Sequence, residues 1–150
     1  MESLGGCQFS CGATLDTWKG IIDGVYFSEL SVTNKEMTKT PDMTEKLGSL
    51  LEVGSMLPGR LGYNNLRRMW GWLVPPVTGN YTFWIASDEN GELWLSINDD
   101  PTNKVRACYA PTSVGHNRDW YLYPQQQSTL IPLDAGQAYY FEVCDARLLC

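Results

Sequence analysis

The chain has 150 residues, 43% of them hydrophobic, and a formal net charge of −6. This length is ordinary for one domain with its own core, and the hydrophobic content argues against disorder. The charge and the lack of a basic stripe exclude nucleic acid as a partner, while calcium and neutral sugars remain compatible.

The first third of the chain is predicted to be rich in loops. Residues 1–15 are predicted to be a poorly ordered N-terminal extension. Residues 16–30 (DTWKGIIDGVYFSEL) contain two glycines that break a helix, so an extended segment or a short strand with turns is expected. The polar residues 33–54 are predicted to be mostly loop, with one helical turn near residues 44–51.

From residue 69 onward the sequence is typical of β-strands. Residues 67–76 (RRMWGWLVPP) are predicted to be a strand that a double proline ends. Residues 80–87 (NYTFWIAS) and 92–98 (ELWLSIN) alternate in the strand period, so each presents one face to a core. The core face of the second strand is predicted to hold Leu93, Leu95 and Ile97.

Two more strands are predicted near the end of the chain. They cover residues 128–133 and 138–143, and the turn DAG at residues 134–136 joins them. Many short strands with Gly and Pro turns indicate an all-β fold, an antiparallel β-sandwich. This sandwich is predicted to span residues 16–143, followed by a divergent tail at residues 144–150.

An acidic turn joins two of these strands. Its residues are Asp88, Glu89, Asn90 and Gly91, and Asn-Gly is a strong hairpin signal. Two carboxylates and an amide are oxygen donors of the kind that calcium takes, although the spacing of a twelve-residue calcium loop is absent. The residues alone leave two alternatives, a solvated turn or a metal site. Asp99 and Asp100 precede a proline and are predicted to form a plain turn.

The stretch HNRDWYLYPQQQS, residues 116–128, groups aromatic and hydrogen-bonding side chains. Trp120 and Tyr123 are candidate sugar contacts, because an aromatic face beside polar groups suits the apolar face and the hydroxyl edge of a sugar. The alternative is that Trp120 plugs the end of the sandwich.

Signals for catalysis are weak. The single histidine, His116, lies in a polar loop and is predicted to be solvated, and no G-x-S-x-G motif occurs. The carboxylates lie on adjacent turns rather than across a cleft, as glycoside hydrolysis would need. We therefore expect that the chain is not an enzyme.

The cysteines and the termini bear on the cellular compartment. Cys7 and Cys11 have the weak spacing C-x₃-C, so a disulfide among Cys7, Cys11, Cys108 and Cys144 is preferred to a zinc site, with an odd cysteine, Cys150, to spare. No signal peptide and no membrane-spanning run is recognised. A glycosylation sequon begins at Asn80, in a predicted turn, and is consistent with secretion.

The segments just described carry a family resemblance. The run GYNNLRRMWGWLVPPVTGNYTFWIASDENGELWLSINDDP, followed by DWYLYPQQQSTLIPLDAGQAYYFE, resembles the protective-antigen fourteen-kilodalton domain family, a lectin-like β-sandwich. The resemblance is dense from about residue 63 to residue 142. It is weaker before that, in TWKGIIDGVYFSEL.

The resemblance implies a calcium-dependent sugar site on the acidic turn. In sugar-binding members of the family, an Asp-Asp pair on this hairpin holds calcium, which holds sugar hydroxyls. Asp88 matches the pair, whereas Glu89 departs from it by one methylene. The second ligand loop and the last strand of the family have no counterpart here, and Asp145 is the remaining oxygen ligand. The implied metal ligands are Asp88, Glu89 and Asp145, and the implied sugar contacts are Asp88, Glu89, Asn90, Trp120 and Tyr123.

These observations give an expected function. We expect a non-catalytic carbohydrate-binding or adhesion module, extracellular or on a cell surface, with calcium as cofactor and glycans as partners, at a site that is incomplete. The alternative is a structural or assembly β-sandwich domain of a larger extracellular protein or glycosidase. A third possibility is a fragment of such a protein.

Overall fold

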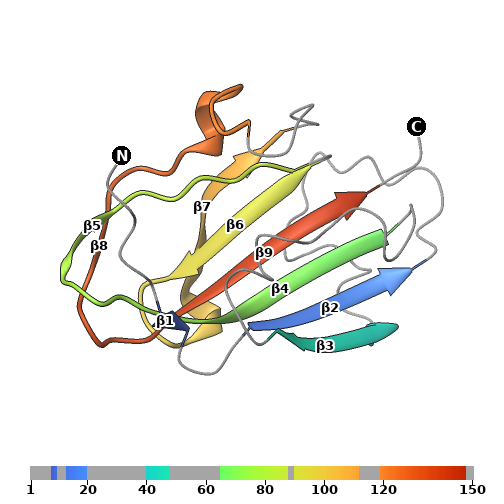
Figure 1. The fold of residues 1–150 in the computed structure, drawn as a ribbon, viewed down its shortest axis with the longest axis horizontal. Coiled ribbons are helices and arrows are strands. Elements are labelled where there is room, and N and C mark those ends of the chain that lie inside the picture. Colours follow the sequence, from blue (N-terminus) through green and yellow to red (C-terminus); the bar gives the residue numbers. More distant parts are fainter. Residues whose placement is uncertain are drawn as a thin grey trace.

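The protein is an all-β sandwich (Figure 1). Its structure, a computed structural model, describes residues 8–9, 13–19, 40–47, 65–87, 90–111 and 119–147. These residues form antiparallel strands, turns and two short 3-10 helices, η2 (Pro101–Asn103) and η3 (Pro124–Gln126), and none of them is in an α-helix. The predicted fold class is confirmed.

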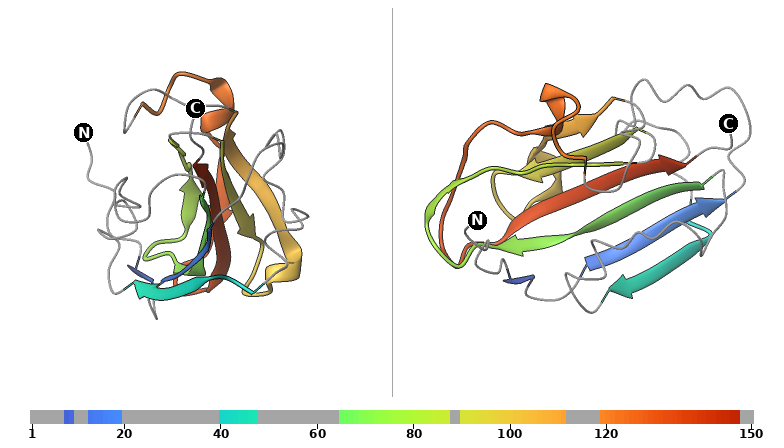
Figure 2. Two further views of the ribbon diagram at one scale, coloured as in Figure 1. Left: turned by 90° about the vertical axis from the view of Figure 1, so that its right-hand side faces the viewer. Right: turned by 45° about the horizontal axis from the view of Figure 1, so that its top comes forward.

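One large antiparallel sheet has the order β3-β2-β4-β9-β6-β7. The short strand β1 pairs with the C-terminal end of β4, at Leu73 and Val74. Several neighbouring strands in this sheet are far apart in the sequence. The right-hand view of Figure 2 shows β9 between β4 and β6. Its strands are β1 (Gln8–Phe9), β2 (Ala13–Lys19), β3 (Met43–Leu47), β4 (Asn65–Val74), β6 (Gly91–Ser96), β7 (Lys104–Ala110) and β9 (Tyr139–Arg147).

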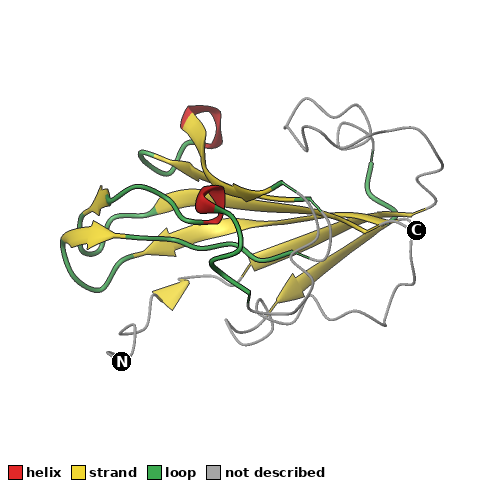
Figure 3. Cartoon of the chain, turned by 90° about the horizontal axis from the view of Figure 1, so that it is seen from above, coloured by secondary structure: helices red, strands yellow, loops and turns green. Residues whose placement is uncertain are grey.

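A smaller layer consists of β5 (Gly79–Tyr81) and β8 (Ile131–Leu133), which pair with each other. The pairing continues irregularly beyond the strands: Phe83 O accepts from Ser128 N at 2.9 Å, and Ile85 N donates to Gln126 O at 3.0 Å. Figure 3 looks along the large sheet and shows this layer beside it. The smaller layer covers one face of the large sheet.

The core lies between the two layers. Alternate residues of the long strands point into it, as the two-residue period of a strand requires. Tyr81 and Ile131 of the smaller layer pack against the same cluster from the other side. The buried members of this cluster are Ala13, Leu15, Met69, Leu73, Leu95, Leu133, Tyr139 and Phe141.

Several local predictions are corrected. The predicted helical turn near residues 44–51 is wrong at its start, because β3 pairs along β2 from Met43 to Leu47. The strand predicted at residues 92–98 ends at Ser96, so Ile97 is 72% exposed instead of facing the core. Residues 80–87 are regular only as far as Tyr81, with one isolated bridge at Trp84.

Strand boundaries and one whole strand also differ from the sequence-based expectation. β7 was not predicted, since KVRACYA alternates charged with small residues and carries few large apolar side chains. β2 begins at Ala13, inside the stretch predicted as an extension, and β9 continues to Arg147, past the predicted end of the sandwich. Partners on β4 hold both of these strands.

Candidate functional site at one end of the sandwich

The acidic turn lies between Ser87 and Gly91, at the start of β6. Asp88 and Glu89 fall outside the described residues, and Asn90 is half-buried. At Gly91 the returning chain passes very close to the outgoing one, so that a Cβ atom there would lie 2.7 Å from Ser87 Cβ. Glycine is therefore required at this position, and it keeps the two arms of the turn together.

The sheet register brings the backbone of Asp145 beside this turn. Gly91 of β6 pairs with Asp145 of β9, and Glu92 pairs with Cys144. The side chain of Asp145 is not among those described. Of the three predicted metal ligands, one thus has its backbone next to the second arm of the turn, although it is 54 positions from Gly91 in sequence (145 − 91).

A buried glutamine connects the loop of residues 119–123, here called the aromatic loop, to the first arm of the acidic turn, residues 85–87. Gln126 is 0% exposed, and its amide group donates to Ile85 O at 2.9 Å and to Asp119 O at 2.7 Å. Its side-chain oxygen accepts from Tyr123 N at 2.8 Å. A buried amide group that lacks a hydrogen-bond partner costs free energy of folding. The bonds of Gln126 therefore fix the loop to the segment that leads into the turn.

The aromatic residues of this loop have different environments. Tyr123 packs against the buried cluster of Ile85, Leu93, Cys108 and Ala110. Its neighbours are exposed at the loop tip: the exposed fraction is 36% for Trp120, 76% for Tyr121 and 50% for Leu122. Tyr123 therefore anchors the loop. Tyr121, which was not among the predicted sugar contacts, has the most accessible ring of this loop. Its position next to Trp120 is the only sequence signal that could have identified it.

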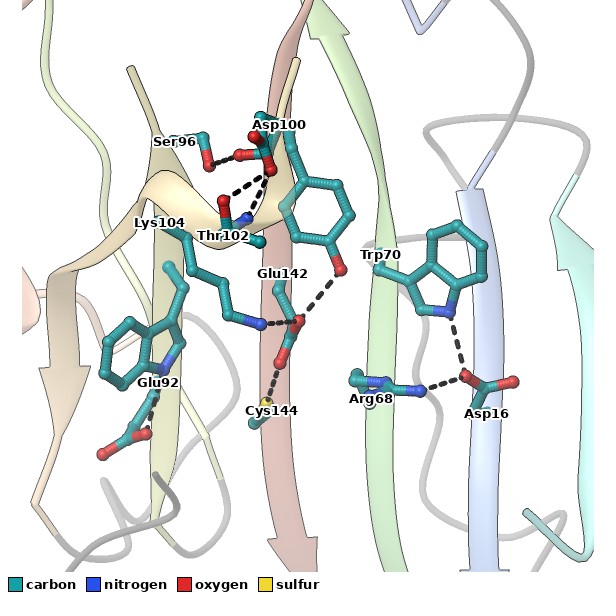
Figure 4. A network of polar contacts seen from close by, with 12 residues as sticks. Asp16, Arg68, Trp70, Glu92, Ser96, Asp100, Thr102, Lys104, Glu142 and Cys144 are labelled. Atoms are coloured by element: carbon teal, nitrogen blue, oxygen red, sulfur yellow. Dashed lines mark hydrogen bonds and ion pairs between the residues drawn. The ribbon is translucent and has the colours of Figure 1, made fainter. Parts of the chain in front are cut away.

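The other face of the large sheet, away from the core, carries a polar network that sequence reasoning missed (Figure 4). Asp16 of β2 is 4% exposed. Its carboxylate accepts from Arg68 Nη2 and from Trp70 Nε1, each at 2.9 Å, and also from Thr44 Oγ1 at 2.8 Å. One buried acid is thus held by one cation, one aromatic N–H group and one hydroxyl.

The same pattern recurs at two glutamates on neighbouring strands. Glu142, 1% exposed, accepts from Lys104 Nζ at 2.6 Å and from the Tyr140 hydroxyl at 2.9 Å. Glu92, 3% exposed, accepts from Arg106 Nη1 at 2.8 Å and from an indole N–H at 3.0 Å. Each buried carboxylate therefore has one cation and one aromatic donor, which compensates its desolvation.

The network shifts the pKa values of its members. Burial by itself would raise the pKa of Asp16, but the hydrogen bonds from Arg68, Thr44 and Trp70 outweigh it, so the pKa is lowered. Burial, and then the charge of Glu142, raises the pKa of the Cys144 thiol well above its usual value. The Cys144 thiol donates to Glu142 at 3.4 Å. The Cys144 thiol is thus buried and engaged within the network.

The turn at Asp99 and Asp100 is a plain turn, as predicted. The carboxylate of Asp100 accepts from Thr102 N at 2.8 Å and from Thr102 Oγ1 at 2.7 Å, and it caps η2. These bonds lower the pKa of Asp100. Both bonds are accepted by Oδ1, so this carboxylate oxygen is engaged within the turn itself.

The predicted disulfide is not formed by Cys108 or Cys144. Both are free and buried. Cys108 faces the core, whereas Cys144 faces the polar network, so the sheet separates their side chains. The remaining cysteines, Cys7, Cys11 and Cys150, lie outside the described residues, as does His116.

The described part of the chain, which does not include Asp88 and Glu89, contains no group of three or more His, Cys, Asp or Glu side chains placed to hold a metal ion. Nor does it contain a helix long and apolar enough to cross a membrane.

Comparison with known families gives one match, to the model described as PA14 domain, over residues 62–144. This range includes the acidic turn, the aromatic loop and strands β4 to β8, and it covers more than half of the chain.

Three similar curated proteins are fibrocystins. The chain is 31% identical to mouse fibrocystin over 85 residues, 43% identical to dog fibrocystin over 54 residues, and 26% identical to human fibrocystin-L over 113 residues. These alignments cover 50%, 36% and 65% of this chain. They span only 2%, 1% and 3% of the relatives, so the chain corresponds to a very small part of each.

A solved structure shares the fold. It is the epithelial adhesin 6 A domain from Candida glabrata, in complex with Galβ1-3GlcNAc, with a TM-score of 0.64. The superposition covers 97% of this chain and 78% of the adhesin domain, at 12% sequence identity. At this identity the likeness establishes the shared fold.

Proposed function

Since this chain belongs to the PA14 domain family, we propose that it is a non-catalytic carbohydrate-binding or adhesion module. The glycan binds at the acidic turn, residues 88–90, next to the exposed aromatic tip of the 119–123 loop. The observation that carries this proposal is the convergence of three segments on one end of the sandwich. Gly91 closes the turn, the register sets Asp145 beside it, and Gln126 ties the aromatic loop to its first arm.

Calcium is the cofactor that suits these residues. Asp88, Glu89, Asn90 and Asp145 would supply carboxylate and amide oxygens, the hard donors that calcium takes, and none is a nitrogen or sulfur ligand that would favour zinc. Bound calcium would supply open coordination positions for sugar hydroxyl groups. Glu89 is one methylene longer than the aspartate that the family places there, so its carboxylate needs an additional torsion fixed. We therefore expect weaker calcium binding than an Asp-Asp pair gives.

The exposed fractions of the aromatic side chains indicate different roles for them in the aromatic loop. Trp120 and Tyr121 offer accessible rings for stacking on a sugar, and Tyr123 holds the loop from the core side. Tyr123 then acts on sugar binding through the position of the loop.

A catalytic role is not favoured by the acids on the described face. Glycoside hydrolysis uses two carboxyl groups that flank the scissile bond and exchange protons. Glu92 and Glu142 are buried, and each is engaged by a cation and an aromatic donor. Burial denies these two carboxyl groups access to a polymer substrate.

The proposed location is extracellular or at a cell surface, as part of a longer chain. The adhesin with the same fold and the size of the fibrocystins support this. The acidic net charge of −6 and the absence of a basic stripe also favour glycans over nucleic acid.

A glycan array probed with the purified chain tests the proposal. The wild type, Asp88→Ala and Trp120→Ala are compared with Asp134→Ala, a matched control in the exposed turn between β8 and β9. We expect the wild type and Asp134→Ala to bind the same glycans, and Asp88→Ala and Trp120→Ala to lose them. Binding that Asp88→Ala retains in full would refute the site.

The second candidate is a structural or assembly module without sugar binding. It is favoured by the polar network, in which three acids of one sheet face are each neutralised within the domain. Such a face stabilises a module of a long chain without any ligand. A folded chain that binds no glycan on the array would support this second function.

A further inference from the structure

The sequence contains one N-glycosylation sequon, Asn80-Tyr81-Thr82, and it lies in the smaller layer. Asn80 is predicted both in a turn and at the start of the strand 80–87, and the structure places it in β5, where it pairs with Pro132 of β8. Asn80 and Pro132 are both exposed. The acceptor asparagine is thus on an ordered and accessible strand.

Strand alternation places both reactive residues of the sequon on the outer side of this layer. Tyr81, between them, packs against the core, and its hydroxyl donates to Val77 O at 2.6 Å. Asn80 and Thr82 flank it and therefore point the other way. Asn80 is exposed on this outer side, and Thr82, which follows the last residue of β5, is half-buried.

The amide of Asn80 is also free to react. No hydrogen bond to another described side chain or backbone group engages it. By contrast, the side-chain oxygens of Asn98 and Gln126 accept hydrogen bonds from the backbone N–H groups of Asp100 and Tyr123. Asn80 and Pro132, its partner on β8, are both exposed on this side of the layer. The surroundings of Asn80 can accept a bulky group without rearrangement of the strand.

We propose that Asn80 is an N-linked glycosylation site of this protein. In the transfer, the amide nitrogen Nδ2 forms a bond to the anomeric carbon of an oligosaccharide carried on a lipid diphosphate. The bond between that carbon and the diphosphate oxygen breaks, and the lipid diphosphate leaves with the electron pair. Nδ2 loses one proton to a base, so no oxidant or reductant is needed.

The attached glycan lies away from the proposed sugar site. Seven positions separate Asn80 from Ser87, the residue before the acidic turn, and a fully extended chain of this length spans at most roughly 23 Å at about 3.3 Å per residue. Figure 1 shows β5 at one end of this segment and the start of β6 at the other. The glycan therefore covers the outer side of the smaller layer, near Leu130, which is 66% exposed, and leaves the acidic turn open.

This inference rests on the proposed extracellular location but not on sugar binding. It is tested by translation of the chain behind a cleavable secretion signal, in the presence of microsomal membranes. We expect one slower-migrating product that an N-glycan-specific amidase removes and that leaves aspartate at position 80. Asn80→Gln and Thr82→Ala should abolish the product, and Thr82→Ser should keep it.

A second acceptor controls for entry into the membrane compartment. Val105→Thr creates a sequon at Asn103, an exposed residue of η2, and Val105 is itself 61% exposed. In an Asn80→Gln background, this variant should regain one glycan. If the Asn103 acceptor is modified while the wild-type chain carries no glycan, the assignment of Asn80 is overturned, and the glycan-array result is unaffected.

Discussion

The two faces of the large sheet use the same strands but bury different groups. Towards the smaller layer, Leu95 and Phe141 pack with other apolar side chains. On the opposite side, Glu92 and Glu142 are buried to a similar degree but are paired with cations and aromatic donors. The first face is stabilised by the removal of apolar area from water, and the second by electrostatic pairing that offsets desolvation.

The two faces are therefore expected to lose stability in different ways when a residue is substituted. An apolar face loses stability gradually, in proportion to the volume removed. A face of paired charges is sensitive to the loss of one partner, since the other is then a buried charge without compensation. The following variants separate the two cases.

Glu142→Ala is expected to have the largest effect. It leaves the Lys104 ammonium, whose side chain is 14% exposed, and the buried Tyr140 hydroxyl without their acceptor. Loss of one partner of a buried pair costs about 3–5 kcal/mol of the free energy of unfolding, measured by denaturant titration. The control Asp134→Ala, in an exposed turn, should change it by less than about 0.5 kcal/mol. Equal effects would mean that the network contributes nothing.

Leu95→Ala tests the apolar face. Leu95 is 3% exposed, and its truncation should cost about 2–5 kcal/mol in the same titration. Ile97→Ala, two residues along and 72% exposed, should cost less than about 0.5 kcal/mol. The reverse order would show that the register of β6 against the core is incorrect.

Asp16→Asn tests the polar face through pH. Because the pKa of Asp16 is lowered in the folded state, its ionised form stabilises the protein above the unfolded value of 3.8. This contribution is lost as the pH falls below 3.8 and through the folded pKa. At pH 7 the variant should lose about 1–3 kcal/mol, and below the folded pKa the two proteins should converge. A pH-independent difference would contradict the assignment.

The smallest perturbation is chemical labelling of the two free thiols, one on each face. Burial raises the pKa of Cys108 to about 12, from 9.0, so its thiolate is about a thousandfold scarcer at pH 8. Cys144 is raised well above its usual value. Alkylation mapped by mass spectrometry should leave both unlabelled in the folded chain and label both in denaturant. Rapid labelling of Cys144 alone would mean that the polar face opens.

The sequence predicted the apolar face better than the polar one. Alternation in 92–98 correctly gave Leu93 and Leu95 as core residues, because one strand carries that information by itself. The Asp16 cluster needs the pairing of β2 with β4, and the Glu142 cluster needs Lys104 from β7, which no local pattern contains. Long-range register, not residue type, determines these contacts.

The candidate site shows the same limit. The signal at Asn90 and Gly91 predicted a chain reversal, and the family resemblance implied its acids. The predicted hairpin is wrong, because β6 pairs with β9 and β7, whereas the segment before the turn bonds to residues 126–128 of the smaller layer. The contribution of Gln126 could not be predicted, since a glutamine in a run of three gives no sign that it is buried. Tyr123 and Tyr121 have the same chemistry, and only packing distinguishes the anchor from the exposed ring.

The affinity of the turn should respond to side-chain length. Glu89→Asp shortens the second acid by one methylene, and we expect tighter calcium binding than in the wild type, since fewer torsions are fixed. Calorimetry of the two proteins side by side measures the change. A weaker complex would mean that the longer side chain is required at this position.

The central claim is that the acidic turn binds calcium, and calorimetric titration of the folded chain tests it most directly. The titration compares the wild type with Asp88→Ala and with the distant control Asp134→Ala, each checked for folding by circular dichroism. We predict specific binding in the wild type and in Asp134→Ala, and its loss in Asp88→Ala. A folded wild type that takes up no calcium, or an Asp88→Ala variant that binds it equally well, would contradict the claim.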